Sequence, residues 1–105
     1  MMIDQKIIDK AIELTHKEIE LIHVPRGDWE QFGAVNQEYG NLYHDLLEMC
    51  SLDHAFFGLY RLLGEALVEE NYDRAAVLKV QIEITEPLKE FVLDQQLRRI
   101  QKGYH

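Results

Sequence analysis

The stretch 65-EALVEENYDRAAVLKVQI-82 decides the fold, because it contains two helical segments joined by a tight turn. The first segment is expected to end near Glu70 or Asn71. Asp73 is placed to cap the next helix, since its carboxylate can accept hydrogen bonds from the free amides of a first helical turn. The stretch therefore predicts a helical hairpin over about residues 65–82.

Side-chain size within this stretch predicts how its two helices pack. Ala75 and Ala76 allow the second helix to approach its neighbour closely, and Tyr72 is expected to fix the angle between the helices. The seam between the two helices is expected to be filled by the apolar side chains Leu67, Leu78 and Ile82.

These residues resemble the UVR motif, the helical hairpin named for the bacterial excision-repair proteins UvrB and UvrC. The motif combines an alanine-containing helix end, an acidic or amide turn, an aromatic residue before an acid, a double alanine, a leucine, a basic residue and a later isoleucine. Here those positions are held by Ala66, Glu70, Asn71, Tyr72, Asp73, Ala75, Ala76, Leu78, Lys79 and Ile82. One departure is Val80, which stands where the family usually has an acid, and we expect it to face neighbouring helices.

The resemblance implies helix-on-helix protein binding without chemistry of its own. It does not imply DNA repair, since the helicase and nuclease parts of those proteins are absent from this stretch. The residues expected to bind a partner are Leu67, Glu70, Tyr72, Asp73, Ala75, Ala76, Leu78, Lys79 and Ile82.

Toward the N-terminus, two further segments have helical periodicity. Residues 3–24 form the first, and the turn around Pro25 and Gly27 ends it. The residues that recur in it at helical spacing are Ile7, Ile8, Ala11, Ile12, Thr15, Ile19 and Ile22. Asp28 is expected to cap the second segment. An aromatic-rich apolar stripe runs along this second segment, and we interpret it as core. It comprises Trp29, Phe32, Val35, Tyr39, Leu42, Tyr43, Leu46, Met49 and Cys50.

The region of residues 51–53 leaves two alternatives open. Ser51 could cap a third helix, or one long helix could continue through a bend. In either case the inward-facing residues are expected to be Phe56, Leu59, Tyr60, Leu63, Ala66 and Leu67. Four glycines lie inside these helical patterns, and close helix packing is expected there rather than hinges. They are Gly33, Gly40, Gly58 and Gly64.

Beyond the hairpin, Pro87 favours either a new helix or a kink, and a last helix is expected over about residues 86–102. Its apolar residues lie on more than one side, which is typical of a helix that contacts both a core and a second subunit. We therefore expect a homodimer or a higher homo-oligomer.

Composition agrees with one all-α domain spanning residues 1–105. The chain of 105 residues is 47% hydrophobic and 29% charged, which is ordinary for a globular protein. We expect a compact antiparallel bundle of four to five helices that contains the hairpin. One cysteine, Cys50, and the lack of an apolar signal segment favour a reducing, cytoplasmic compartment and no membrane attachment.

The net charge of −8 disfavours direct binding of nucleic acid, because phosphates repel an acidic surface. The one basic cluster is formed by Arg98, Arg99 and Lys102, and cations there also suit the negative end of a helix. An accessory role in nucleic-acid repair is therefore a lesser alternative.

The second alternative is a metal-binding helical bundle with enzymatic activity. His44 and Glu48 are four residues apart, as are Cys50 and His54, so each pair shares one side of a helix. Bundle metal sites usually combine Glu-x-x-His placements from several helices, a pattern that this sequence lacks. The leading interpretation is a bacterial, non-catalytic adaptor that binds another protein and needs no cofactor.

Overall fold

A computed structural model describes residues 3–85 of the chain, and within this range it consists of four helices and no strand. Helix α1 spans Gln5–Ile22, α2 spans Trp29–Met49 and α3 spans His54–Val68. The fourth helix begins at residue 72 and continues to residue 85, the last one described. The predicted all-α bundle is confirmed for this range. The expected helix over 86–102, with Arg98, Arg99 and Lys102, lies outside it.

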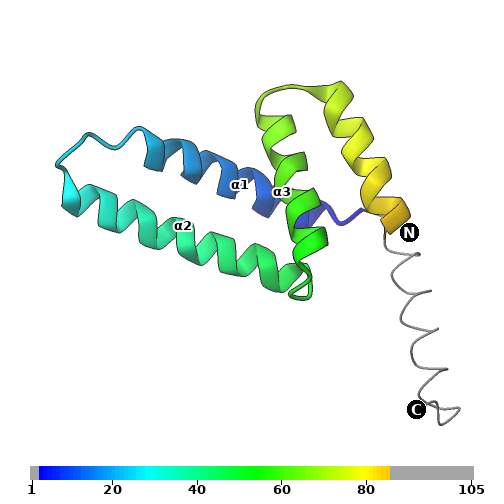
Figure 1. The fold of residues 1–105 in the computed structure, drawn as a ribbon, viewed down its shortest axis with the longest axis horizontal. Coiled ribbons are helices and arrows are strands. Elements are labelled where there is room, and N and C mark those ends of the chain that lie inside the picture. Colours follow the sequence, from blue (N-terminus) through cyan, green and yellow to red (C-terminus); the bar gives the residue numbers. More distant parts are fainter. Residues whose placement is uncertain (1–2, 86–105) are drawn as a thin grey trace, which may run out of the picture.

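The helices form two hairpins that meet at α3 (Figure 1). Helices α1 and α2 run antiparallel, α3 packs across the end of this pair that lies away from the turn at residues 23–28, and the fourth helix returns along α3. The core is centred on α3, where Phe57, Tyr60 and Leu63 are buried. It joins buried residues of the other helices, among them Ala11, Leu14, Leu46, Leu78 and Ile82.

Aspartate side chains begin each of the first three helices. Asp4 accepts from the amide of Lys6 at 2.9 Å, Asp28 from Gln31 at 3.1 Å, and Asp53 from Phe56 at 3.0 Å. Each carboxylate satisfies an amide that has no partner inside its helix. The predicted cap at Asp28 is confirmed.

The break between α2 and α3 is a true turn, so the alternative of one bent helix is wrong. Ser51 does not cap α3, because Asp53 does. Ser51 and Leu52 instead have left-handed φ angles of 56° and 59°. Their amides bond to the carbonyls of Glu48 and Leu47, both at 2.9 Å, which satisfies the last carbonyls of α2.

Close helix packing explains one of the four helical glycines. A Cβ atom at Gly64 would lie 2.7 Å from the backbone carbon of Ala11 and 2.8 Å from its Cβ, so α1 and α3 are in near backbone contact there. Added Cβ atoms at Gly33, Gly40 and Gly58 would meet nothing within 4 Å. The prediction of close packing is therefore confirmed for Gly64 and wrong for the other three.

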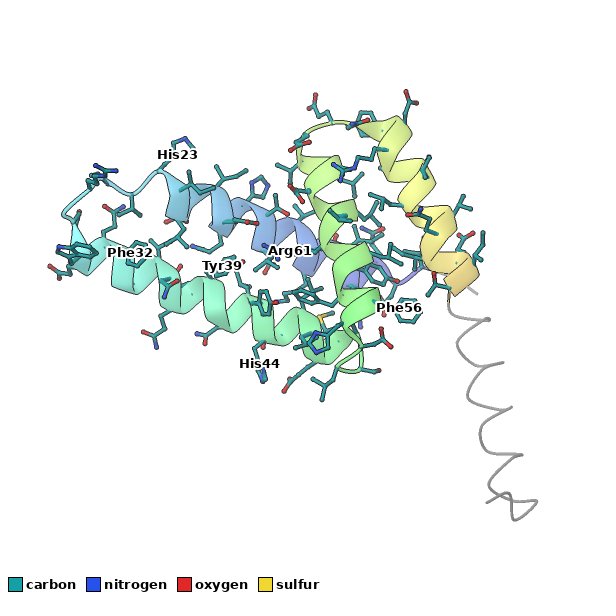
Figure 2. The ribbon with its side chains drawn as sticks, in the orientation of Figure 1. His23, Phe32, Tyr39, His44, Phe56 and Arg61 are labelled. Carbon is teal, nitrogen blue, oxygen red and sulfur yellow. The ribbon has the colours of Figure 1, made fainter. Side chains whose placement is uncertain are left out.

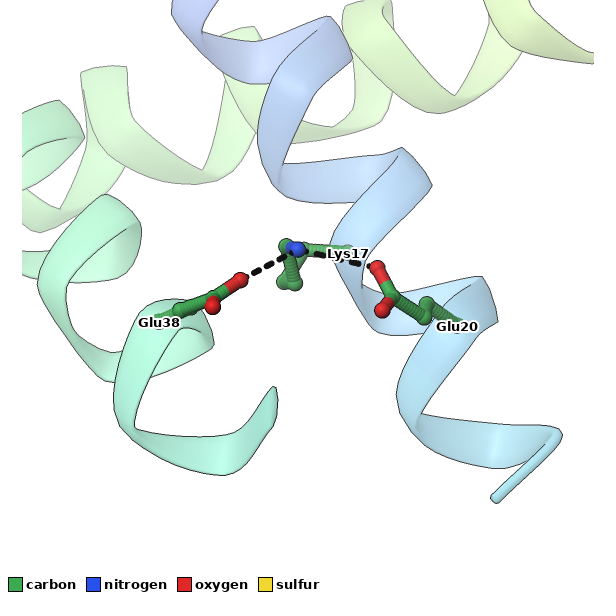
Figure 3. Close-up of polar contacts among 3 residues, drawn as sticks. All are labelled: Lys17, Glu20 and Glu38. Carbon is green, nitrogen blue, oxygen red and sulfur yellow. Dashed lines mark hydrogen bonds and ion pairs between the residues drawn. The ribbon is translucent and has the colours of Figure 1, made fainter. Parts of the chain in front are cut away.

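Two polar clusters tie the helices together. Arg61 on α3 donates to Glu18 on α1 at 3.1 Å and to the Tyr39 hydroxyl on α2 at 3.2 Å, and its guanidinium lies 5.8 Å from the ring centre of Tyr43. Arg61 and Tyr39 are labelled in Figure 2. On the surface, Lys17 of α1 bonds both Glu20, at 2.9 Å, and Glu38 of α2 (Figure 3). The Glu38 hydrogen bond, followed by that of Glu20, raises the pKa of Lys17.

The aromatic stripe of α2 is only partly core, which corrects the prediction. Val35 and Leu46 are buried, and Tyr43 packs on Phe57 with ring centres 4.6 Å apart. Trp29 and Phe32, at the start of the helix, are 77% and 40% exposed. Ile19 and Ile22 at the end of α1 are exposed as well. These four side chains lie past the region that α3 covers.

Candidate protein-binding hairpin

The predicted hairpin is formed by α3 and the fourth helix, joined at residues 69–71. Helix α3 ends with Glu69 as its cap, and Glu70 takes a left-handed φ of 59°. The amide of Asn71 bonds to the carbonyl of Ala66 at 2.8 Å, and the amide of Glu70 bonds to that of Leu67 at 3.2 Å. This pair of bonds is a Schellman turn, which closes a helix while the chain reverses direction.

Asn71 caps the fourth helix, which corrects the prediction that Asp73 does so. The Asn71 side-chain oxygen accepts from the amide of Arg74 at 3.2 Å, and its carbonyl accepts from the amide of Ala75 at 3.0 Å. Asp73 lies inside the first turn, where a negative charge still interacts favourably with the positive end of the helix.

The inner face of the hairpin is packed within the chain. Ala75, Leu78 and Ile82 are 2%, 5% and 2% exposed, and Leu67 packs against the same core. The prediction that Leu67, Leu78 and Ile82 fill the seam is confirmed. These four residues of the expected partner-binding set therefore lie in the interior, where a partner reaches them only if the hairpin opens.

The remaining members of the predicted set lie on the surface. They are Glu70, Tyr72, Asp73, Ala76 and Lys79. Tyr72 is 65% exposed, so it does not fix the helix angle as predicted. Val80 is 52% exposed, and the expectation that it faces neighbouring helices is wrong. Of the two adjacent alanines, only Ala75 is buried in the hairpin, and Ala76 is exposed.

Sequence reasoning missed an apolar strip on the outer side of the fourth helix. We call this strip the outer face; it consists of Tyr72, Val77, Val80 and Ile84. Val77 and Ile84 are 58% and 55% exposed. Val80 follows Tyr72 by eight residues and Ile84 follows Val80 by four, so the strip keeps to one side of the helix, opposite Ala75, Leu78 and Ile82. The sequence could have revealed this strip, because its four residues form a second apolar side of the same helix at helical spacing.

The candidate metal ligands are only partly brought together. His44 Nε2 lies 3.0 Å from a carboxylate oxygen of Glu48, and both side chains are exposed. His54 is exposed at the start of α3, and no three His, Cys, Asp or Glu side chains in residues 3–85 are grouped to hold one ion. Burial of Cys50, helped by the nearby charge of Asp53, raises the pKa of its thiol to about 11. The thiol is therefore a packed group and a poor nucleophile at neutral pH.

An open depression of about 420 Å³ lies between α1 and α2, lined by Lys10, Asp45, Glu48 and Met49. It is wide open to solvent, unlike the enclosed, mostly apolar pockets that bind small molecules. Among the helices of residues 3–85, none combines the length and apolar character needed to cross a membrane.

Comparison of the chain with protein-family models, with curated proteins and with solved structures finds no match. The resemblance to the UVR motif therefore depends on the residues of the hairpin themselves.

Proposed function

We propose that this chain is a non-catalytic adaptor that binds another protein through the outer face of the hairpin. The observation that carries the proposal is the two-sided character of the fourth helix. One side supplies Leu78 and Ile82 to the core, while the opposite side presents four large apolar residues that are each more than half exposed. An ordinary surface helix has a polar outer side, so an apolar one favours a binding role.

The exposed polar residues around this face support the resemblance-based part of the proposal. Glu70, Asp73 and Lys79 surround the apolar strip and supply a charged rim, while the strip itself supplies the buried centre of an interface. The expected partner presents an apolar helix surface that covers Val80 and its neighbours. The setting proposed for this interaction is the bacterial cytoplasm, and association with further copies of the chain is part of the proposal.

The test compares two variants that add the same charge to the same helix. Val80→Glu places a carboxylate in the centre of the outer face, while Gln81→Glu places one at the next position, turned by about 100° around the helix. Both sites are exposed, so both proteins should keep their circular dichroism spectrum and melting temperature. We expect Val80→Glu to lose the proteins that co-purify with the wild-type chain from a bacterial lysate, and Gln81→Glu to retain them.

A further variant separates the side chain of Glu70 from the turn it occupies. Glu70→Gly keeps the left-handed turn, because glycine adopts a positive φ without strain, but it removes the carboxylate. Weaker capture of the same partner would place Glu70 in the interface. If Val80→Glu captured the same proteins as the wild type, the proposed binding face would be wrong.

A further inference from the structure

The surface of the α1–α2 hairpin that α3 covers continues beyond α3. Helix α3 touches α1 at Ala11 through Gly64, and Arg61 extends its reach to Glu18 and Tyr39. Ile22 follows Glu18 by one helical turn. Phe32 precedes Tyr39 by two turns, and Figure 2 shows it nearer the connecting turn than Tyr39 and Arg61.

Four large apolar side chains make up this continuation, which we call the distal face. They are Ile19, Ile22, Trp29 and Phe32, with exposed fractions of 41%, 73%, 77% and 40%. Trp29 and Phe32 already form an edge-to-face pair, with ring centres 6.3 Å apart and planes at 80°. Trp29 and Phe32 therefore form one aromatic pair at the start of α2, and Ile19 and Ile22 lie at the end of α1 that leads into the same connecting turn.

The size of the distal face favours a partner over solvent. Large side chains of this kind contribute about 200 Å² each, so the exposed fractions correspond to roughly 450 Å² of apolar surface. Patches of that size on a monomer often have a binding function. Two such faces placed together bury roughly 900 Å² before flanking residues are added, which is below the roughly 1,200 Å² of a stable interface and in the range of a weak, reversible one.

We propose that a second copy of this chain covers the distal face, with the two α1–α2 hairpins packed face to face and antiparallel. A surface two helices wide is matched by another of the same width, and two paired hairpins make a four-helix bundle. In each copy α3 occupies the other end of the same face, so a parallel arrangement would bring the two α3 helices into collision. The antiparallel arrangement places each connecting turn beside the other copy's α3.

A lipid bilayer is a poorer occupant. Asp28 and Glu30 stand beside Trp29 at the start of α2, and carboxylates are costly to bury in lipid. The net charge of −8 also opposes approach to an anionic membrane surface. Solvent-exposed charged residues around an apolar centre are instead typical of the rim of a protein–protein interface.

The experiment uses the full chain and its single tryptophan. Sedimentation velocity across a concentration series should show a reversible monomer–dimer equilibrium. The emission of Trp29 should shift to shorter wavelength over the same concentrations, because dimerisation removes its indole from water. The variants Ile22→Glu and Phe32→Glu keep the reporter and change exposed sites, and each should raise the dissociation constant by about 30-fold or more, as expected for a central interface residue.

Phe32→Ser provides a milder second variant, and circular dichroism verifies that each variant stays helical. Asn41→Glu is the matched control, because it adds a carboxylate at an exposed site on the side of α2 opposite Phe32, and it should dimerise like the wild type. A chain that is monomeric at all concentrations would overturn the inference, as would dimerisation unaffected by Ile22→Glu and Phe32→Ser. Loss of the dimer in Val80→Glu alone would overturn it too, and would assign self-association to the outer face of the proposed function.

Discussion

Gly64 is the residue on which the crossing of α1 and α3 depends. Its missing Cβ leaves room for the Ala11 backbone, and an added methyl would lie 2.7 to 2.8 Å from three Ala11 atoms. Gly64→Ala is therefore expected to lower the free energy of unfolding by about 2 kcal/mol, since the two backbones must separate. Gly58→Ala, at an open site of the same helix, should instead raise it by about 0.5 to 1 kcal/mol. Urea denaturation of both variants measures the difference, and equal stabilities would contradict the packing.

Residue burial was predictable from spacing only where another helix was present to cover the side chain. The positions Phe56, Tyr60 and Leu63 were expected to face inward, and they do. Trp29 has the same helical phase as residues of the core, yet nothing in residues 3–85 covers it. Periodicity gives the direction in which a side chain points along its helix, but it does not say whether a neighbour lies there.

At the scale of single elements, the fourth helix has two candidate N-caps, Asn71 and Asp73, which are two positions apart. Asn71 accepts the Arg74 amide, whereas Asp73 lies within the first turn. Asn71→Ala should therefore cost about 1 kcal/mol of stability. Asp73→Ala should cost about 0.5 kcal/mol, because only a charge near the helix end is lost. The comparison requires thermal or urea unfolding of the two variants, and a larger loss for Asp73→Ala would restore the sequence-based assignment.

Helix ends were harder to place than helices because the turns here use unusual residues. Glycine is the common left-handed residue after a helix, so Ser51, Leu52 and Glu70 gave no such signal. Asp53 rather than Ser51 caps α3, because Ser51 belongs to the turn that ends α2, where its amide bonds to the carbonyl of Glu48. The hairpin itself was predictable, since its seam residues and its double alanine follow helical spacing.

At the scale of the whole molecule, Arg61 joins the first three helices through Glu18 and Tyr39. About a third of its side chain is exposed, so solvent screens part of the interaction. Arg61→Met, which keeps much of the packing, is expected to lower the free energy of unfolding by about 1 kcal/mol. Lys10→Met removes only the surface pair with Glu13 and should cost less than about 0.5 kcal/mol. Equal urea midpoints for the two variants would show that Arg61 does not hold the helices together.

The position of α3 across only one end of the α1–α2 pair could not have been predicted from helix lengths or spacing. That position depends on contacts between residues far apart in the chain, such as Ala11 with Gly64. Within residues 3–85, it also leaves an apolar surface exposed at each hairpin.

The burial of Cys50 has a practical consequence for labelling. It is the only cysteine of the chain and is 6% exposed, with a thiol that stays protonated at neutral pH. Maleimide reagents react with accessible thiolates, so they will not label the native cysteine while it stays buried between α2 and α3. A cysteine that replaces an exposed residue beside each face, such as Gln81 or Arg26, can carry a spin label or dye without a cysteine-free background. Each hairpin can thus be tagged separately, and its contacts followed by distance measurements in an otherwise native protein.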